Sequence, residues 1–255
     1  SVNQLCGVFS GRLTDWSQVT GSGRTGAITL VYRSESSGTT ELFTRFLNAK
    51  CSEALPFAVT TTFSSSYGTG VPSTAVAATG SQGVMTALNA TDGGITYMSP
   101  DYAASTLAGL DDATKVAKVG GVSPAPDNVS AAIAVVPVPT NVNDQNAWVP
   151  VFGPAGSADP TVVPYPTTGY PILGFTNLIF SQCYADATQT SQVRAFFTRH
   201  FGSSALNSND NAIKANRFVP LPTTWKTAIT NNFVTATSTL SIGKADVCNG
   251  IGRPL

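Results

Sequence analysis

The sequence predicts an α/β fold, in which strands alternate with helices along the chain. Residues 27–32 (AITLVY) are rich in β-branched and aromatic side chains and place apolar residues on one face, as a strand does. A polar turn follows at residues 33–40, and from Glu41 onward the apolar residues recur with the period of a helix. Further strand-like and helical runs follow, and this alternation indicates lobes of the α/β class.

The period of a strand and the period of a helix also predict the remaining elements. Helices are predicted over residues 75–90, 189–201 and 223–236. Strand-like runs lie at residues 57–63, 95–98, 115–119, 133–138 and 172–180. Residues 149–168 contain five prolines, so this stretch is expected to be extended and poor in regular structure. It is the best place for a domain boundary.

Charge and hydropathy exclude several functions. Charged residues make up only 11% of the chain, and 14 basic side chains balance 14 acidic ones. A neutral chain of this kind lacks the basic patches that nucleic acids or acidic membranes require. No apolar stretch approaches the length of a membrane-spanning helix, so membrane insertion is not expected. With 42% apolar residues the chain is expected to fold, and a surface of uncharged polar residues suits an exported protein.

The polar turn at residues 33–40, RSESSGTT, carries the clearest functional signal. Ser37, Gly38 and Thr39 stand where a helix begins, and the first backbone N–H groups of a helix point outward without an acceptor. Those groups, two hydroxyls and the positive end of the helix dipole favour a bound anion. Arg33 adds a forked, permanently charged guanidinium. A small tetrahedral oxyanion fits this set of donors.

Glu35 can act in two ways beside Arg33. It can orient the guanidinium, or it can accept a hydrogen bond from a protonated oxyanion, because an ionised carboxylate is only an acceptor. A second interpretation of the whole turn is also open. In that interpretation the Ser and Thr residues only cap the helix, and Arg33 is a solvated surface charge.

The chain has four cysteines, an even number that allows three pairings: Cys6, Cys51, Cys183 and Cys248. No Cys-x-x-Cys spacing occurs and His200 is the only histidine, so metal binding is not expected. Cys6 and Arg12 have the Cys-x5-Arg spacing of cysteine phosphatases, but no His precedes the cysteine and no Ser or Thr directly follows the arginine. We discount that interpretation, because a cysteine in a disulfide has no thiolate to offer.

The run YRSESSGTTELFTRFL, which begins at Tyr32, resembles the phosphate-binding segment of the phosphate-specific substrate-binding proteins of ABC transporters. Within that group it is most similar to the DING proteins. The resemblance covers essentially the whole chain, and the further runs that carry it are FSGRLTDW, ATGSQGVMTAL, GGITYMSPDYA, YPTTGYPILGFTNLIFSQCYAD and VCNGIGRPL.

The resemblance implies a two-lobed fold of the periplasmic-binding-protein or Venus-flytrap type, whose lobes close over phosphate. It implies that inorganic phosphate is bound without cofactor or metal, through Arg33, Glu35, Ser37, Gly38 and Thr39. It also implies the disulfides Cys6–Cys51 and Cys183–Cys248, each within one lobe. Because disulfides form in oxidising compartments, the protein is expected to be extracellular or periplasmic.

The beginning of the chain departs from the family. DING proteins open with Asp-Ile-Asn-Gly, and this chain opens with Ser-Val-Asn-Gln. In the family a long N-terminal segment, which carries the other lobe's phosphate contacts, precedes the position of Leu5. We therefore expect residues 1–164 to form the phosphate-binding lobe without its N-terminal segment, and residues 165–255 to form the C-terminal part of the second lobe. We also expect the missing segment to be a partner, supplied as a second chain or lost by cleavage and still bound, and we expect this polypeptide to be stably folded only beside it.

Three functions remain open from the sequence. The first is binding of phosphate without chemistry. The second is phosphomonoesterase (phosphatase) activity, which has been proposed for some DING proteins, although the sequence shows no activated nucleophile and no cluster of aspartates for catalytic metals. The third is an interaction protein that acts on other proteins, which the sequence neither supports nor excludes.

Overall fold

The computed structural model describes residues 1–54, 56–204, 208–249 and 251–252. Its helices are α1 (Val2–Ser10), α2 (Gly38–Lys50), α3 (Gly80–Ala90), α4 (Pro100–Ala103), α5 (Pro126–Ile133), α6 (Ala187–His200), α7 (Asp210–Ala215), α8 (Thr223–Ile229) and α9 (Ala245–Cys248). Its strands are β1 (Thr29–Arg33), β2 (Val76–Ala78), β3 (Gly94–Ile95), β4 (Val151–Gly153) and β5 (Val162–Pro164). Short 3-10 turns lie at Trp16–Gln18, Phe63–Ser66, Ala108–Asp111 and Gln145–Trp148, and a π-helical turn at Thr230–Val234.

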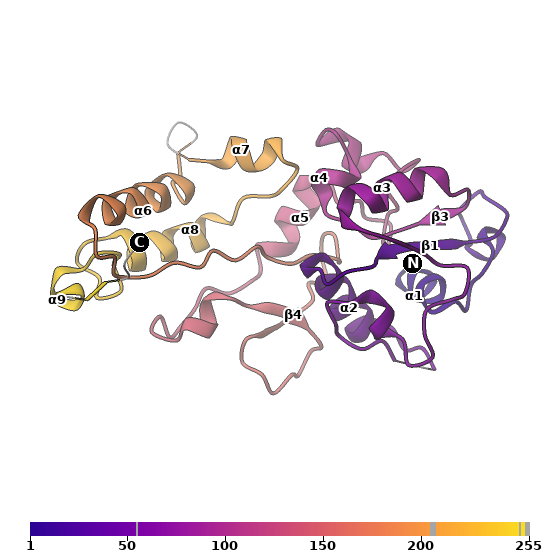
Figure 1. The fold of residues 1–255 in the computed structure, drawn as a ribbon, viewed down its shortest axis with the longest axis horizontal. Coiled ribbons are helices and arrows are strands. Elements are labelled where there is room, and N and C mark those ends of the chain that lie inside the picture. Colours follow the sequence, from indigo (N-terminus) through magenta and orange to yellow (C-terminus); the bar gives the residue numbers. More distant parts are fainter. Residues whose placement is uncertain (55, 205–207, 250, 253–255) are drawn as a thin grey trace.

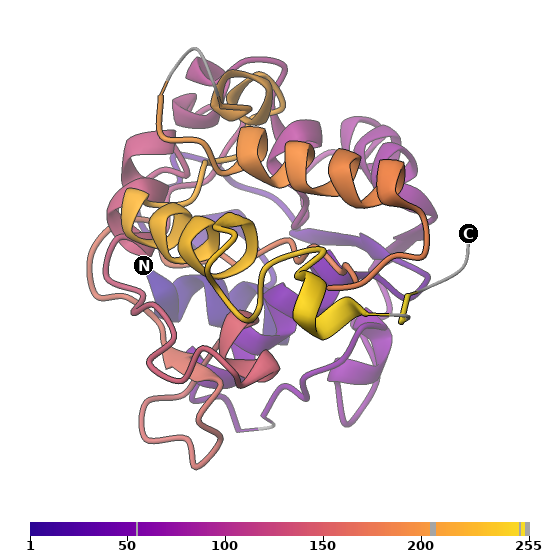
Figure 2. The same ribbon diagram turned by 90° about the vertical axis from the view of Figure 1, so that its left-hand side faces the viewer.

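The molecule is elongated and has two halves (Figure 1). The N-terminal half contains α1 to α3 and their sheet, and the C-terminal half contains α6, α8 and α9 (Figures 1 and 2). None of the described helices is long and apolar enough to cross a membrane.

A parallel sheet organises the N-terminal half. Its order is β2-β1-β3, with β1 in the centre, and Arg33 lies opposite Ala78 while Leu30 lies opposite Ile95. Because the three strands run in the same direction, their carboxyl ends share one edge of the sheet. The turns into α2 and α3 therefore leave from neighbouring points on that edge.

Aromatic side chains fix α2 against the rest of this half. Phe43 of α2 packs edge to face on Phe9 of α1 and stacks on Tyr97, with ring centroids 4.7 Å apart in both pairs. Phe63 is completely buried beside all three rings. Each buried aromatic ring removes a large apolar area from water, so these contacts hold the helix in one position.

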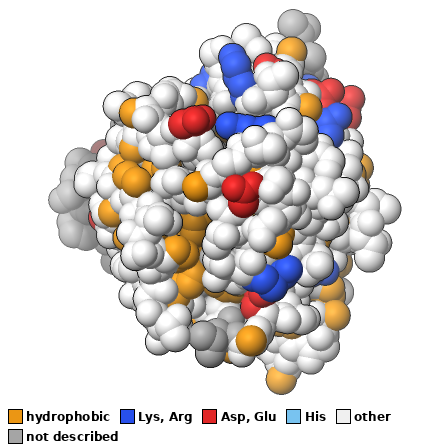
Figure 3. Space-filling view, turned by 90° about the vertical axis from the view of Figure 1, so that its right-hand side faces the viewer, with side chains coloured by type: hydrophobic (Ala, Val, Ile, Leu, Met, Phe, Trp, Pro, Cys, Tyr) orange, Lys and Arg blue, Asp and Glu red, His pale blue; other side chains and the backbone are white. Residues whose placement is uncertain are grey.

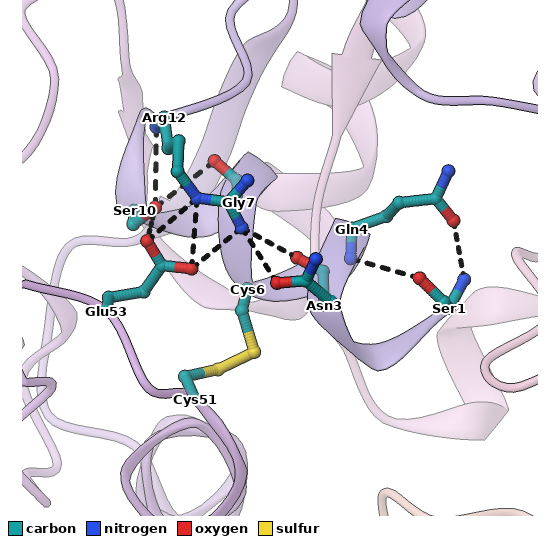
Figure 4. Close-up of a disulfide and its surroundings, with 9 residues drawn as sticks. All are labelled: Ser1, Asn3, Gln4, Cys6, Gly7, Ser10, Arg12, Cys51 and Glu53. Carbon is teal, nitrogen blue, oxygen red and sulfur yellow. Dashed lines mark hydrogen bonds and ion pairs between the residues drawn. A yellow bond between two sulfur atoms is a disulfide. The ribbon is translucent and has the colours of Figure 1, made fainter.

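Two disulfides are present, with the pairing that the family resemblance implied. Cys6–Cys51 joins α1 to the residue after α2, and beside it Glu53 accepts a 2.9 Å hydrogen bond from Nη2 of Arg12 (Figure 4). Cys183–Cys248 joins residue 183 to α9. Since Cys6 is bonded to Cys51, the Cys-x5-Arg spacing does not mark a cysteine nucleophile.

The proline-rich stretch contains more regular structure than expected. Within it β4 and β5 pair in parallel, and Phe152 of β4 stacks on Tyr165, with centroids 5.4 Å apart. Tyr165 in turn packs edge to face on Phe46 of α2, at 5.3 Å. The side chain that opens the segment 165–255 therefore lies against the N-terminal half. The domain division after residue 164 stays a prediction.

Residues 172–180, predicted to be a strand, are extended but have no strand partner in the described part of the chain. Their backbone groups make no hydrogen bond to any described residue. The segment crosses the middle of the molecule between the two halves (Figure 1). Leu173 is buried, whereas Ile179 is 98% exposed. The side-chain pattern is that of a strand, but a ladder also needs a neighbour.

Three further runs predicted as strands are not strands. Residues 115–119 contribute one bridge, Val119 to Val122, closed by Gly120 and Gly121 at positive φ. Residues 133–138 begin at the last residue of α5, and residues 57–63 form a loop that bonds to α2. Short apolar runs do not distinguish strands from buried helix ends or loops.

The helix predicted over 75–90 begins only at Gly80, because residues 76–78 form β2. The helix predicted over 223–236 ends at Ile229 and continues as the π-helical turn.

Candidate functional site

Arg33 and Glu35 form an ion pair at the carboxyl end of β1. Oε1 of Glu35 accepts a 2.7 Å hydrogen bond from Nε of Arg33 and a second hydrogen bond from Nη2. The Arg33 side chain is only 16% exposed and that of Glu35 is 37% exposed. The solvated surface arginine of the second interpretation is therefore wrong, because this guanidinium is largely enclosed and held on one side by a carboxylate.

The beginning of α3 completes the surroundings of this pair. Oε1 of Glu35 also accepts from the backbone N–H of Gly80, at 2.9 Å, and Nη1 of Arg33 donates to Oγ of Ser81, at 3.2 Å. Hydrogen bonds from Arg33, with smaller contributions from backbone N–H groups, lower the pKa of Glu35 to about 2. At neutral pH this carboxylate is charged, and its observed partners are Arg33, the hydroxyl of Ser34 at 3.3 Å and the Gly80 N–H of α3.

Sequence reasoning did not assign Gly80 and Ser81 to the site, because a turn of the form Gly-x-x-Gly, here Gly80 to Gly83, is a common way to enter a helix. One signal was present in the sequence. Both 27–41 and 76–83 follow the order strand, polar turn, helix. Since β1 and β2 are parallel neighbours, the two turns had to meet at one sheet edge.

The first turn of α2 presents donors that no described residue accepts. Ser37 is the N-cap, yet its side chain makes no capping hydrogen bond, and its own N–H donates to the Thr61 carbonyl at 2.9 Å. The N–H groups of Gly38, Thr39 and Thr40 have no acceptor among the described residues. The hydroxyls of Ser37 and Thr39 make no hydrogen bond there either. Simple capping by these side chains is therefore not what the structure shows.

Buried contacts hold this turn in place. Thr40 Oγ1 lies 2.7 Å from the Tyr97 hydroxyl, and Thr44 Oγ1 donates to the Thr60 carbonyl at 2.9 Å. Burial raises the pKa of Tyr97 to about 12, so its hydroxyl stays neutral. The turn with its unpaired N–H groups thus rests on a rigid support.

Charge elsewhere is sparse and mixed. On the face shown in Figure 3, acidic and basic side chains are scattered singly or in small groups among uncharged surface. Within the described residues, no group of three or more His, Cys, Asp and Glu side chains is arranged to hold a metal ion.

Comparison with known proteins identifies the family. A family model described as a PBP superfamily domain matches residues 1–200. The chain belongs to the PBP superfamily. Similar proteins include alkaline phosphatase L of Pseudomonas aeruginosa, which is 69% identical over 260 residues. A phosphate-binding protein from an unknown prokaryotic organism is 63% identical over 272 residues. Both comparisons cover 100% of this chain, and they cover 66% and 71% of the two relatives.

Solved structures of similar proteins agree with this assignment. A high-affinity periplasmic phosphate-binding protein, PfluDING, solved with bound phosphate, has a TM-score of 0.92 and 68% identity; the match covers 100% of this chain and 70% of that one. A human phosphate-binding apolipoprotein has a TM-score of 0.88 and 61% identity, with 100% and 71% covered. The resemblance to DING and phosphate-binding proteins and the periplasmic-binding-protein-like α/β fold are confirmed. The chain spans 66% of the length of alkaline phosphatase L.

Proposed function

We propose that this chain binds inorganic phosphate at the start of α2, with Arg33 supplying the positive charge. The observation that carries the proposal is the row of three N–H groups at Gly38, Thr39 and Thr40 that have no acceptor in the described structure. They stand at the positive end of a 13-residue helix, where the dipole favours an anion. The phosphate bound by PfluDING, which is 68% identical, supports the choice of ligand.

Each predicted residue has a part in the proposed site. Ser37 and Thr39 add hydroxyl donors, and Gly38 adds a backbone N–H where no side chain would obstruct an oxygen. Arg33 contributes the charge-assisted hydrogen bonds. Glu35 orients Arg33, since its carboxylate is already in contact with the guanidinium. Of the two roles considered for Glu35, this is the one that we propose.

The test is calorimetric titration of the chain with phosphate, with Arg33→Ala as the decisive variant. Truncating one partner of a desolvated charge pair costs 2 kcal/mol or more, so the dissociation constant should rise by about 30-fold or more. Arg33→Lys should also weaken binding, because the planar fork is lost.

Arg45→Ala is a matched control. Arg45, which lies in α2, uses the same two nitrogens as Arg33, Nε and Nη2, to bond Glu41, and its side chain is 26% exposed. Its loss should change phosphate affinity by less than about threefold, because the only hydrogen-bond partner of its side chain among the described residues is Glu41. If Arg33→Ala binds phosphate as well as Arg45→Ala does, the proposed site is wrong.

A second candidate function, hydrolysis of phosphomonoesters at the same site, is favoured by the relative named alkaline phosphatase L. The same donors would hold the phosphoryl group of an ester. Release of p-nitrophenol from its phosphate ester is the measurement. An activity of this chain should fall with Arg33→Ala and persist with Arg45→Ala. An activity that both variants retain equally belongs to a contaminant.

An extracellular or periplasmic location is also proposed. Two disulfides suit an oxidising compartment, and PfluDING is a periplasmic protein. Fractionation of cells that express the full-length natural protein would test this, and recovery in the cytosol with reduced cysteines would contradict it.

A further inference from the structure

The beginning of α3 contacts Arg33 and Glu35 at two points. The parallel register places Arg33 of β1 opposite Ala78 of β2, and α3 starts two residues later at Gly80. The Gly80 N–H then reaches Oε1 of Glu35, and Oγ of Ser81 accepts from Nη1 of Arg33. Residues 48 positions apart in sequence are thereby joined at the side-chain level.

The hydrogen bonds of the guanidinium show what these contacts achieve. A guanidinium has five N–H donors: one on Nε and two on each terminal nitrogen. Glu35 engages Nε and Nη2, and Ser81 engages Nη1. One N–H remains on each terminal nitrogen. These two N–H groups are available to donate to the oxygens of an oxyanion.

We propose that Ser81 is a positioning residue for phosphate: it fixes the plane of the Arg33 guanidinium from the side opposite Glu35, so that the two free N–H groups are directed in advance. The Gly80 amide assists by holding the carboxylate of Glu35 against Nε and Nη2. Neither group touches the ligand. The inference rests on the proposed function, and it adds α3 to the elements that set phosphate affinity.

The physical effect is pre-organisation. An arginine has several rotatable bonds, and ordering such a side chain on binding lowers affinity. Without Ser81, Nη1 loses its anchor and the guanidinium can rotate about its contact with Glu35. Binding must then order it, so affinity should fall although every ligand contact remains possible.

Ser81→Ala tests the inference by phosphate calorimetry. We expect the dissociation constant to rise about fivefold, the effect of ordering one long side chain. Ser81→Thr keeps the hydroxyl and should bind within about twofold of the wild type. Thr86→Ala is the matched control, because Thr86 lies on the same helix and its hydroxyl donates only to the Gln82 carbonyl. It should bind as the wild type does.

A double-mutant cycle separates positioning from a general structural role. In the Arg33→Ala background, Ser81→Ala should have no further effect on phosphate affinity, because nothing is left to position. An equal loss in both backgrounds would overturn the inference, as would wild-type affinity in Ser81→Ala. If Ser81→Ala is silent while Arg33→Ala is strongly impaired, only this inference fails. If the wild-type chain does not bind phosphate, the proposed function fails with it.

Discussion

At the scale of single residues, the proposed site depends on one carboxylate keeping its charge. Oε1 of Glu35 accepts hydrogen bonds from two Arg33 nitrogens and from the Gly80 amide. A protonated carboxyl would lose part of its capacity as an acceptor and all of its charge. The orientation of Arg33 therefore lasts only over the pH range in which Glu35 is ionised.

We predict that Glu35 titrates with a pKa of about 2, far below the 4.5 of an unperturbed glutamate. A depressed folded-state pKa means that the charged group favours the folded state above about pH 4.5, and that this contribution is lost as the pH falls toward 2. Carboxyl carbon shifts followed by NMR from pH 7 downward will measure it. Arg33→Ala should move the midpoint upward, because it removes the largest cause of the shift. A wild-type midpoint near 4.5 would contradict the prediction.

The site residues that are close together in the sequence could be predicted from it, and the site residues that are distant in the sequence could not. Arg33, Glu35 and Ser37 lie within five residues, so any turn between β1 and α2 places them near one another. Ser81 reaches Arg33 only through the pairing of β1 with β2. No local pattern around residue 81 states which strand will be the neighbour.

At the scale of elements, helices were predicted better than strands. The helix expected over 189–201 appears as α6, because its apolar period and its N-cap, Asp186, are local signals. A strand needs a neighbouring strand. The run predicted at residues 27–32 pairs with β2 and β3 and forms β1, whereas residues 172–180 have no strand partner in the described structure. Residues 172–180 therefore failed as a strand because they have no strand partner among the described residues, whereas residues 57–63 and 133–138 failed because a short apolar run also suits a loop or a helix end.

One prediction at this scale concerns α7 and α8. The Lys226 side chain of α8 is only 6% exposed, and its Nζ lies 2.5 and 2.7 Å from the two carboxylate oxygens of Asp210. Asp210→Ala leaves a buried ammonium without its counter-ion, which should lower the free energy of unfolding by about 3 kcal/mol. Urea denaturation at pH 7 measures the change.

Asp246→Ala is the control for that measurement. Asp246 also lies in the first turn of a short helix and pairs with a lysine, but its side chain is 79% exposed and lies 3.6 Å from Lys244. Its loss should change the free energy of unfolding by less than about 1 kcal/mol. Equal destabilisation by Asp210→Ala and Asp246→Ala would show that burial of the pair between α7 and α8 has no special effect.

At the scale of the whole molecule, the α/β class follows from the alternation of periods, whereas the placement of the two halves does not. The two halves are linked by residues 172–180, which run between them (Figure 1). The start of this segment is anchored, since the Leu173 side chain is buried and the backbone of Gly174 lies close to the Leu42 side chain of α2. Further along, Leu178 and Ile179 are 44% and 98% exposed. The residue types of 172–180 do not indicate that the segment is anchored at its start and exposed further along.

The last prediction follows from the unpaired backbone of residues 176–180. Amide hydrogens exchange slowly when they are held in stable hydrogen bonds, and these five residues make none with the described chain. We expect them to exchange within about tenfold of the rate of an unstructured peptide, while Val31, in the central strand β1, exchanges slower by several powers of ten. Hydrogen–deuterium exchange followed by NMR resolves the individual amides.

Added phosphate should slow the exchange of the amides of residues 38–40 and leave that of residues 176–180 unchanged, because only the first group would donate to the ligand. Strong protection of 176–180 without phosphate would mean that this segment finds a strand partner in solution, and a dependence of that protection on protein concentration would identify the partner as a second copy of the chain.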